Sequence, residues 1–277
     1  MSSPIKPDVV VVGNVTKDLT KEGYVLGGGV SYAALTVKAL GLNPAVVTSC
    51  GIDVDPSALL QGIPAHVVPS NSTTTFVNSY HGGRRRQVIK AVANVIFAAD
   101  VPDDWRAAPL VLLAPIAREI DDSILDAFHS ATVAASIQGW VRDWDDQGNV
   151  FSKPWDGGRV LERIDAVQFS DDDDVPSEQI AQWNERCPVL LNTRGSKGCR
   201  IWTRGAWRDL PAFSANEVDP TGAGDVFSAA YLVRFRESED ELDAARFAGC
   251  AASFCVERQG VEGIPNRVQI EARLRRK

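Results

Sequence analysis

The chain alternates between short, almost wholly apolar runs and longer stretches of mixed polarity. The apolar runs fall at residues 9–12, 45–48, 110–113, 132–137, 166–169 and 189–192. Strands that are covered on both faces give continuous apolar runs, whereas half-exposed strands alternate. Helical patterns lie between the runs. The sequence therefore predicts the α/β class, with a doubly wound, mostly parallel sheet covered by helices on both faces.

Two segments, at about residues 14–27 and 73–91, interrupt this pattern with polar, alternating sequence. The second reads TTTFVNSY, then the turn residues HGG, then RRRQVIKA. This order predicts a β-hairpin that lies outside the main sheet. We interpret both segments as parts of one single domain that spans residues 1–277.

A hairpin beside a doubly wound sheet is either a surface decoration or a lid. Ligands of such sheets bind at the carboxyl ends of the strands, and a lid there excludes water. We favour a small β lid, because contact with a ligand or partner would account for Phe76 and Tyr80 on an otherwise polar ribbon. The same two side chains would permit, without requiring, a lid-mediated dimer in place of a monomer.

The stretch DPTGAGD at residues 219–225 comes directly before a helical pattern. Its two glycines let the backbone approach a ligand closely, and the start of a helix offers unpaired amides and the positive end of a dipole. An anion-binding site is therefore predicted here. Asp225 falls in the first helical turn, where it would repel a phosphate unless it had another task, such as removing a proton from a hydroxyl during phosphoryl transfer. The simpler interpretation is a glycine-rich turn with a capping aspartate.

Taken as a whole, this seven-residue string resembles the signature of the ribokinase-like (PfkB) carbohydrate kinases, and it is highly specific to them. The resemblance implies that Gly222, Ala223 and Gly224 donate amide N–H groups to the transferred phosphoryl group. It also implies that Asp225 deprotonates the acceptor hydroxyl. The chain has no GxxxxGK[ST] sequence, so the loop is not a Walker A loop.

Two further matches lie near the N-terminus. The opening VVVVGNVTKD resembles the first strand of the family, which implies that Asp18 hydrogen-bonds substrate hydroxyls. Gly27 and Gly28, with Gly29 after them, resemble the paired glycines of the family, where absent side chains admit the sugar. On its own a glycine run could equally be an ordinary hinge.

A third match is the segment NTRGSKG at residues 192–198, which follows a buried strand and is similar to the ATP-binding segment of the family. The resemblance implies ATP as the phosphoryl donor, with the adenine between residues 213–217 and the helix that contains residues 248–253. The residues that it implies for nucleotide binding are Asn192, Thr193, Gly195, Gly198 and, within the signature, Thr221.

The chain departs from the family pattern at two places. Tyr32 stands where the family usually has asparagine, which puts ribokinase-type contacts to a furanose in doubt. The sequence SDDD at residues 170–173 replaces an NxxE motif that orients Mg²⁺ through water, so Asp173 takes the glutamate position. Hard oxygen ligands and bound water suit Mg²⁺. A run of aspartates can also be a solvated loop without a metal.

Within the family, the strings LGGGVSYAA, TTTFVNSY, SIQGWVR and NTRGSKGCRIW resemble the inositol kinase branch. This implies a sugar or polyol acceptor, by preference a cyclic polyol such as myo-inositol, with Gln138 near the substrate. Simple packing at a strand end is the other interpretation of Gln138 and Trp140. The alternative functions are a nucleoside or other sugar kinase of the same family, or a catalytically inactive ligand-binding member. The departures at Tyr32 and Ser170 support inactivity, and the intact signature with Asp225 speaks against it.

Composition excludes several other classes. At 277 residues, with 44% hydrophobic and 23% charged side chains, the chain has the composition of a soluble globular protein. A formal net charge of -7 gives no electrostatic support to a nucleic-acid-binding face. No apolar run approaches the length of a membrane span, and the first residues lack a signal-peptide pattern. We therefore expect a cytoplasmic protein with no nucleic-acid or membrane partner.

Overall fold

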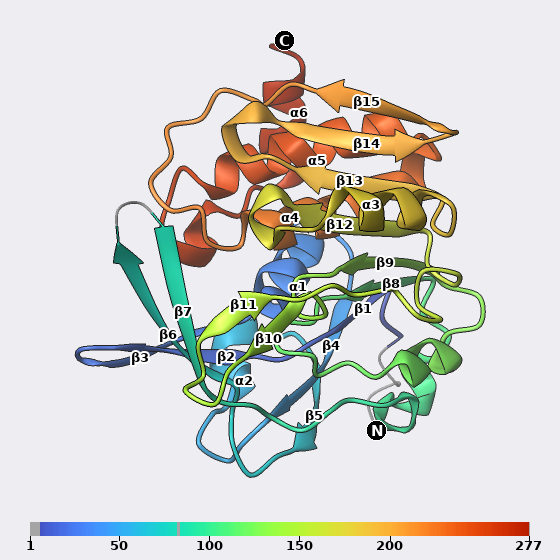
Figure 1. The fold of residues 1–277 in the computed structure, drawn as a ribbon. Coiled ribbons are helices and arrows are strands. Elements are labelled where there is room, and N and C mark those ends of the chain that lie inside the picture. The colour runs from blue at the N-terminus through green and yellow to red at the C-terminus, as the bar shows by residue number, and fades with distance from the viewer. Residues whose placement is uncertain (1–5, 82–83, 277) are drawn as a thin grey trace.

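All six predicted apolar runs lie in one nine-stranded sheet of the protein, seen in a computed structural model that describes residues 6–81 and 84–276 (Figure 1). From one edge to the other its strands are β15 (Ala206–Leu210), β14 (Cys199–Thr203), β13 (Val189–Thr193), β12 (Ala166–Ser170), β9 (Thr132–Ser136), β8 (Leu110–Leu113), β1 (Val9–Val12), β4 (Pro44–Cys50) and β5 (Ala65–Pro69). Strands β13 to β5 pair in parallel, and β14 and β15 continue antiparallel. The predicted α/β fold with a mostly parallel sheet is confirmed.

The two faces of this sheet are covered differently. Val9 and Val11 of β1 face one apolar cluster, and Val10 and Val12 face another, because successive side chains of a strand point to opposite faces. The first cluster packs against α-helices, as predicted. The helices of this cluster are α1 (Gly29–Ala39), α4 (Ala223–Ser238), α5 (Glu241–Cys255) and α6 (Arg267–Leu274), with the short α2 (Pro56–Leu60) at its edge.

The second face departs from the prediction that helices cover both sides. Among residues 61–81 and 84–176 there is no α-helix, and α3 (Ser177–Asn184) is the α-helix that adds a buried side chain to the second cluster. Prolines and glycines punctuate this part of the chain and restrict helices to single turns. The short 3₁₀ helices of the protein are η1 (Ala98–Asp100), η2 (Asp103–Trp105), η3 (Asp122–Ala127), η4 (Asp171–Asp173), η5 (Gly195–Lys197) and η6 (Gly260–Gly263). Trp140 stacks on Trp155, and Trp155 contacts Trp183 edge to face, so that three tryptophans help to cover this side of the sheet.

The two polar segments pair with one another in a separate four-stranded sheet, which we call the lid sheet. Its strand order is β3 (Gly23–Gly27), β2 (Thr16–Thr20), β6 (Thr75–His81) and β7 (Arg84–Ala91). Strands β2 and β6 pair in parallel, and the other pairs are antiparallel. Gly82 and Gly83 of the predicted turn, and the side chain of Tyr80, lie outside the described residues.

Phe76 corrects one expectation about this sheet. The side chain is 2% exposed and packs with Ile89 and Ala117 in a small apolar cluster of its own. Neither a ligand nor a partner is therefore needed to explain Phe76, and it offers no surface to a lid-mediated dimer. It anchors the lid sheet instead.

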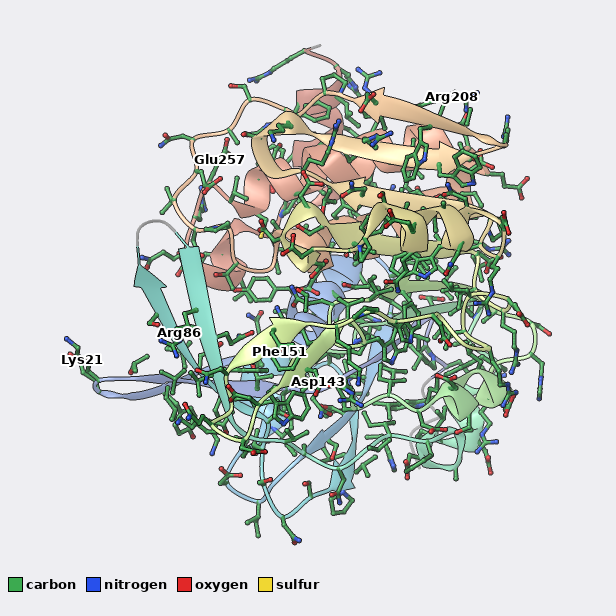
Figure 2. All side chains as sticks on the ribbon, in the orientation of Figure 1. Lys21, Arg86, Asp143, Phe151, Arg208 and Glu257 are labelled. Atoms are coloured by element: carbon green, nitrogen blue, oxygen red, sulfur yellow. The ribbon has the colours of Figure 1, made fainter. Side chains whose placement is uncertain are left out.

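A two-stranded ribbon, β10 (Arg142–Trp144) and β11 (Val150–Ser152), lies against strand β7 of the lid sheet; Figure 2 labels Arg86 on β7 and Phe151 on the ribbon. Arg86 Nη2 donates to Asn149 Oδ1 at 2.8 Å, and the Ile89 amide donates to the Gly148 carbonyl at the same distance. The lid sheet and the ribbon are thus joined by hydrogen bonds. Within the described ranges, no helix combines the length and apolar character that a membrane crossing needs.

Candidate active site

The DPTGAGD stretch ends in a helix start, as predicted. Helix α4 begins at Ala223, and Gly222 is its N-cap with φ of 78°, in the left-handed region that favours glycine. A Cβ atom at residue 222 would also overlap the aromatic ring of Tyr32. The loop therefore needs glycine for two reasons, and Tyr32, which is 7% exposed, supports the loop from α1.

Asp225 lies in the first turn of α4, where amides lack carbonyl partners within the helix. The amide of Ala223, the first helical residue, donates to the Pro220 carbonyl at 3.3 Å. Part of the residue stays exposed, but burial of the carboxyl group raises its pKa from the ordinary value to about 7. The positive charge of Arg142 lowers this pKa, and the negative charge of Asp173 raises it. A carboxyl group with this pKa changes protonation state near neutral pH.

Gly27, Gly28 and Gly29, which we call the glycine triplet, run between two carboxylates. A Cβ atom at Gly27 would lie 2.9 Å from Oδ2 of Asp18, and one at Gly29 would overlap the carboxylate of Asp225. Between them, Gly28 is the N-cap of α1 with φ of 106°, and a Cβ atom there would overlap the backbone of the β1–β2 connection. The structure thus brings the predicted Asp18, Gly27 and Gly28 to Asp225, with a stretch free of side chains between the two carboxylates.

Asp173 and Gln138 also meet at this site. Asp173 is 7% exposed, accepts the Ser170 amide N–H at 2.7 Å and accepts a side-chain hydrogen bond from Gln138. Burial contradicts the solvated-loop interpretation of Asp173. Gln138 lies close enough to affect the pKa of Asp173. Burial raises the pKa of Asp173, and the nearby Arg142 charge lowers it.

Arg142 was not among the predicted site residues. It follows Gln138 by four positions, on β10, and its charge acts on both Asp173 and Asp225. The string SIQGWVR contains this arginine, but its position next to the carboxylates depends on how the chain folds back after β9. A cation beside two carboxylates at a helix start is typical of sites that handle phosphoryl groups.

Gln168 connects the predicted nucleotide segment to α4, and it too was missed. Gln168 Nε2 donates to Thr193 Oγ1 at 3.0 Å, and its Oε1 accepts from Ser228 Oγ at 3.3 Å. Gln168 is 4% exposed, so this amide is a fixed bridge between β12, β13 and α4. Thr193 consequently lies on the same side of the sheet as the start of α4.

The other residues that were predicted to bind the nucleotide have different surroundings. Asn192 Nδ2 donates to Asp171 at 3.1 Å, but its buried Oδ1 accepts no hydrogen bond among the described residues. Gly195 adjoins open space, and the Thr221 amide donates to Asp219 at 3.0 Å. A Cβ atom at Gly198 would overlap the backbone at the end of β15 and just after it, so this glycine is explained by the close approach of that segment.

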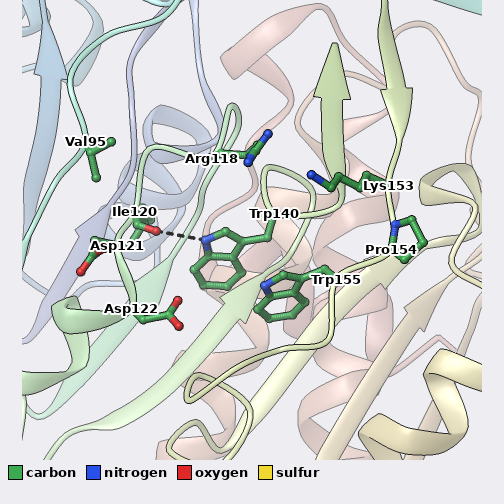
Figure 3. Close-up of a pocket in the computed structure, with 9 residues that line it drawn as sticks. All are labelled: Val95, Arg118, Ile120, Asp121, Asp122, Trp140, Lys153, Pro154 and Trp155. Carbon is green, nitrogen blue, oxygen red and sulfur yellow. Dashed lines mark hydrogen bonds between the residues drawn. The ribbon is translucent and has the colours of Figure 1, made fainter. Parts of the chain in front are cut away.

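A cavity of about 330 Å³ lies away from these residues and is lined by Val95, Arg118, Ile120, Asp121, Asp122, Trp140, Lys153, Pro154 and Trp155 (Figure 3). The two basic residues that line it, Arg118 and Lys153, already form ion pairs with Asp143, each at 2.9 Å. The Trp140 indole N–H donates to the Ile120 carbonyl at 3.2 Å, and its ring stacks on Trp155. Trp140 is thus a packing residue, and the cavity holds none of the predicted site residues.

Comparison with known proteins agrees with this geometry. Residues 165–267 match the family described as pfkB family carbohydrate kinase. An inositol 3-kinase of Arabidopsis thaliana is 28% identical over 279 residues, which cover 91% of this chain and 74% of the relative. A pyrophosphate-dependent kinase in the ribokinase family, solved with a pyrophosphate analog and myo-inositol, has a TM-score of 0.79 at 22% identity, covering 95% of this chain and 99% of that one. Arabidopsis thaliana ribokinase, solved with ribose and ATP, has a TM-score of 0.75 at 24% identity, covering 98% and 99%.

The nine-stranded sheet with its lid is therefore the ribokinase fold. Sequence similarity agrees with this class over residues 165–267, which match the pfkB family of carbohydrate kinases. The matched relatives and structural neighbours are kinases, and the chain is a phosphotransferase with an alcohol group as acceptor.

Proposed function

We propose that the protein is an ATP-dependent kinase that transfers the terminal phosphoryl group to a hydroxyl of a cyclic polyol resembling myo-inositol. The observation that carries the proposal is the position of Asp18 and Asp225 beside the two ends of the glycine triplet. An acceptor in this gap presents one hydroxyl to Asp18 and another to Asp225. The start of α4 lies on the Asp225 side, where the phosphoryl group would be held.

In this mechanism Asp225 is the general base. A pKa of about 7 leaves a large fraction ionised at neutral pH, and a base of this strength is well matched to proton transfer there. The acceptor oxygen attacks the terminal phosphorus, its proton passes to the Asp225 carboxylate, and the bond to the nucleoside diphosphate breaks. The amides of Gly222, Ala223 and Gly224 stabilise the phosphoryl oxygens, and Arg142 supplies positive charge beside them.

The polyol preference rests on similarity and on local chemistry together. The inositol 3-kinase matches along most of this chain, and the pyrophosphate-dependent structure was solved with myo-inositol. Asp18 and Gln138 offer acceptor and donor groups of the kind that bind ring hydroxyls. A nucleoside or another sugar is the alternative acceptor. Tyr32 speaks against ribokinase-type contacts to a furanose, because it stands where the family commonly has asparagine.

For the donor, the buried Oδ1 of Asn192 supports a ligand near the end of β13, since a buried acceptor without a partner is costly. Gly195, Gly198 and Thr221 stay part of this proposed ATP site. ATP and inorganic pyrophosphate are both donors for structural neighbours of this chain. We favour ATP because the segment NTRGSKG resembles the ATP-binding segment of the family.

Mg²⁺ would fit this site through one protein carboxylate, water and the phosphates of the donor. The described residues hold no group of three or more His, Cys, Asp or Glu side chains that could bind a metal alone. Mg²⁺ commonly keeps several waters and takes one or two carboxylates, which agrees with the buried Asp173 as an indirect ligand. When bound, the ion neutralises phosphate charge.

We expect phosphoryl transfer to vanish in excess chelator and to return with Mg²⁺ or Mn²⁺, because both ions accept octahedral oxygen ligation. Asp173→Asn should raise the Mg²⁺ concentration needed for half-maximal rate. The measurement is product formation across a metal titration for both proteins. Full activity in excess chelator would remove the metal from the proposal.

The deciding experiment pairs each donor, ATP or pyrophosphate, with a panel of polyols, sugars and nucleosides, and identifies products by phosphorus NMR. Transfer from ATP to a cyclic polyol is the expected result. Transfer to a nucleoside or a furanose sugar would correct the acceptor, and transfer from pyrophosphate alone would correct the donor. An acceptor that binds in calorimetry without turnover by any donor would identify the inactive ligand-binding alternative.

A further inference from the structure

Three polar side chains form a row across the lid sheet: Asp18 on β2, Asn78 on β6 and Gln87 on β7. Asn78 Nδ2 donates to Asp18 Oδ1 at 2.8 Å, and Gln87 Nε2 donates to Asn78 Oδ1 at 3.0 Å. Asn78 and Gln87 face each other in the pairing register of β6 and β7. The row is therefore continuous through three strands, from the acceptor site to the far side of the lid sheet.

The row belongs to the packed face of the lid sheet. Phe76 lies two residues from Asn78, and Ile89 lies two residues from Gln87, so all four side chains share one face. Phe76 and Ile89 are 2% and 6% exposed, and Gln87 itself is 8% exposed. This burial limits the rotamers that the two amide side chains can adopt.

The chemistry of the groups fixes the direction of every hydrogen bond in the row. An ionised carboxylate only accepts, so Asn78 must turn its NH₂ group toward Asp18. The carbonyl oxygen of Asn78 then points the other way, and it can only accept, so Gln87 must turn its own NH₂ group toward Asn78. Gln87 thus stabilises, through Asn78, the orientation in which an N–H group meets Asp18.

We infer that Asn78 and Gln87 are positioning residues for the acceptor, acting through the carboxylate of Asp18. Their bond to Oδ1 orients the carboxylate so that Oδ2 faces the space beside Gly27, where a Cβ atom would lie 2.9 Å away. An acceptor hydroxyl in that space donates to Oδ2. This inference rests on the proposed function, and it extends acceptor recognition to a side chain that does not touch the acceptor.

The test compares steady-state constants for Gln87→Leu and Gln87→Glu with the wild-type protein. Gln87→Leu removes the terminal donor, and we expect KM for the acceptor to rise about fivefold, the value of one buried neutral hydrogen bond. Gln87→Glu keeps the size of the side chain but places an acceptor opposite Asn78 Oδ1. Asn78 can then donate to only one of the two carboxylates, so its hydrogen bond to Asp18 is weakened or lost, and the KM effect should be the larger one. In both variants kcat and the donor KM should stay within about twofold of wild type.

Lys90→Leu serves as the matched control, because Lys90 lies on the same strand but is exposed on the other face. It should change none of these constants. Thermal unfolding of each variant reports folding directly, so a KM effect in a variant that unfolds at the wild-type temperature does not come from a misfolded strand. A change in kcat or in the donor KM with an unchanged acceptor KM would overturn the inference.

A double-mutant cycle with Asp18→Asn separates this inference from the proposed function. An asparagine side chain can present either of its groups to Asn78, so Gln87→Leu should have almost no further effect on KM in that background. Equal fold-changes in both backgrounds would overturn the relay and leave the acceptor site intact. If Asp18→Asn itself leaves the acceptor KM unchanged, the proposed acceptor site is wrong, whatever the Gln87 variants do.

Discussion

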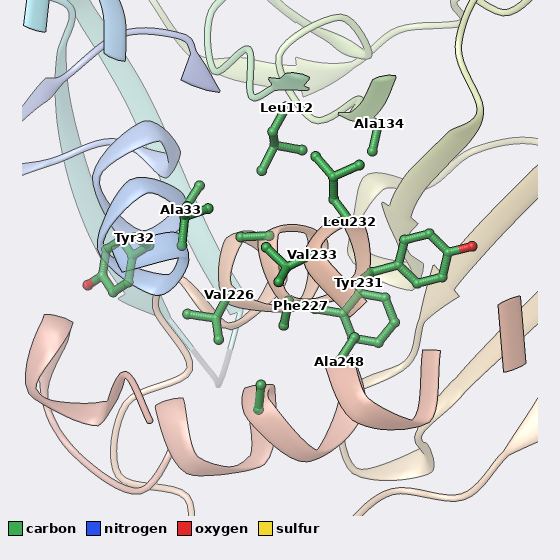
Figure 4. Close-up of a cluster of buried hydrophobic side chains, with 14 of the residues drawn as sticks. Tyr32, Ala33, Leu112, Ala134, Val226, Phe227, Tyr231, Leu232, Val233 and Ala248 are labelled. Carbon is green, nitrogen blue, oxygen red and sulfur yellow. The ribbon is translucent and has the colours of Figure 1, made fainter. Parts of the chain in front are cut away.

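Asp225 and Asp18 lie beside the two ends of the glycine triplet, but they belong to different parts of the molecule. Asp225 begins a helix of the core, and the next two side chains, Val226 and Phe227, are 0% and 2% exposed between α1, the sheet and α5 (Figure 4). Asp18 belongs to the lid sheet, where the next residue on its strand, Leu19, is 39% exposed. The same residue type thus meets a packed environment at one end and a half-solvated one at the other.

The two carboxylates are also controlled by different forces. Burial dominates at Asp225 and raises its pKa to about 7, which makes it suited to accepting a proton. At Asp18 the structure shows a directed hydrogen bond, in which Asn78 Nδ2 donates to Oδ1 at 2.8 Å. The contrast teaches that core packing can adjust proton affinity while a lid can adjust geometry, and it predicts that the two sites govern different kinetic constants.

The largest effect is expected for Asp225→Asn, which keeps the shape of the side chain but cannot accept the proton. We expect kcat to fall by roughly 100-fold or more, the usual scale of a general base. Donor affinity should survive, because the proposed phosphate ligands are backbone amides of residues 222–224, and loss of a negative charge favours an anion there. Rates and donor titration calorimetry measure both quantities. A folded variant with wild-type turnover would remove Asp225 as the base, and an unfolded one would return it to the role of a helix cap.

Asp18→Asn should have a smaller effect and a different target. A hydrogen bond to a charged group contributes about 1.5–3 kcal/mol, so KM for the acceptor should rise roughly tenfold or more. The donor KM and the pKa that governs activity should stay the same, because Asp18 is not among the charges that act on Asp225. Steady-state rates with each substrate varied in turn provide the measurement. A large fall in kcat at saturating acceptor would break the division between the two carboxylates.

The sequence was enough to predict the frame of the fold and the helix start that carries Asp225. The apolar runs gave the strands of the main sheet, because a strand covered on both faces must be apolar throughout. The DPTGAGD string gave the start of α4 and Asp225. The glycines at 27 and 28 were recognised by resemblance, and the structure adds the physical reason, which is the contact of the triplet with Asp18, Asn14 and Asp225.

Other parts could not be predicted, because they depend on contacts between distant segments. Arg142, Gln168 and Gln87 lie on strands that the chain brings together only after folding, and a single glutamine or arginine in a strand has no periodic signal. The covering of the second sheet face by 3₁₀ turns and tryptophans was missed for a related reason. Whether a mixed stretch forms an α-helix or single turns depends on where prolines fall relative to the sheet, and the apolar pattern does not record this.

The smallest of the expected effects concerns pH and tests how Asp225 is controlled. Because the base must be ionised, kcat/KM should rise with pH through about 7, the pKa of Asp225 in the free protein, and then level off. Arg142 lowers this pKa, so Arg142→Met should move the rise to higher pH, whereas Asp173 raises it, so Asp173→Asn should move the rise to lower pH. Both displacements should be modest, since burial is the larger cause of the shift. The readout is the pH at which kcat/KM rises and not the height of the rise, because both variants also change the charge beside the phosphates.

Asp18→Asn is the control and should leave this pH unchanged. If Arg142→Met and Asp173→Asn moved the rise in the same direction, the charges beside Asp225 would not act as described, and a displacement in Asp18→Asn would show that the lid also sets proton affinity.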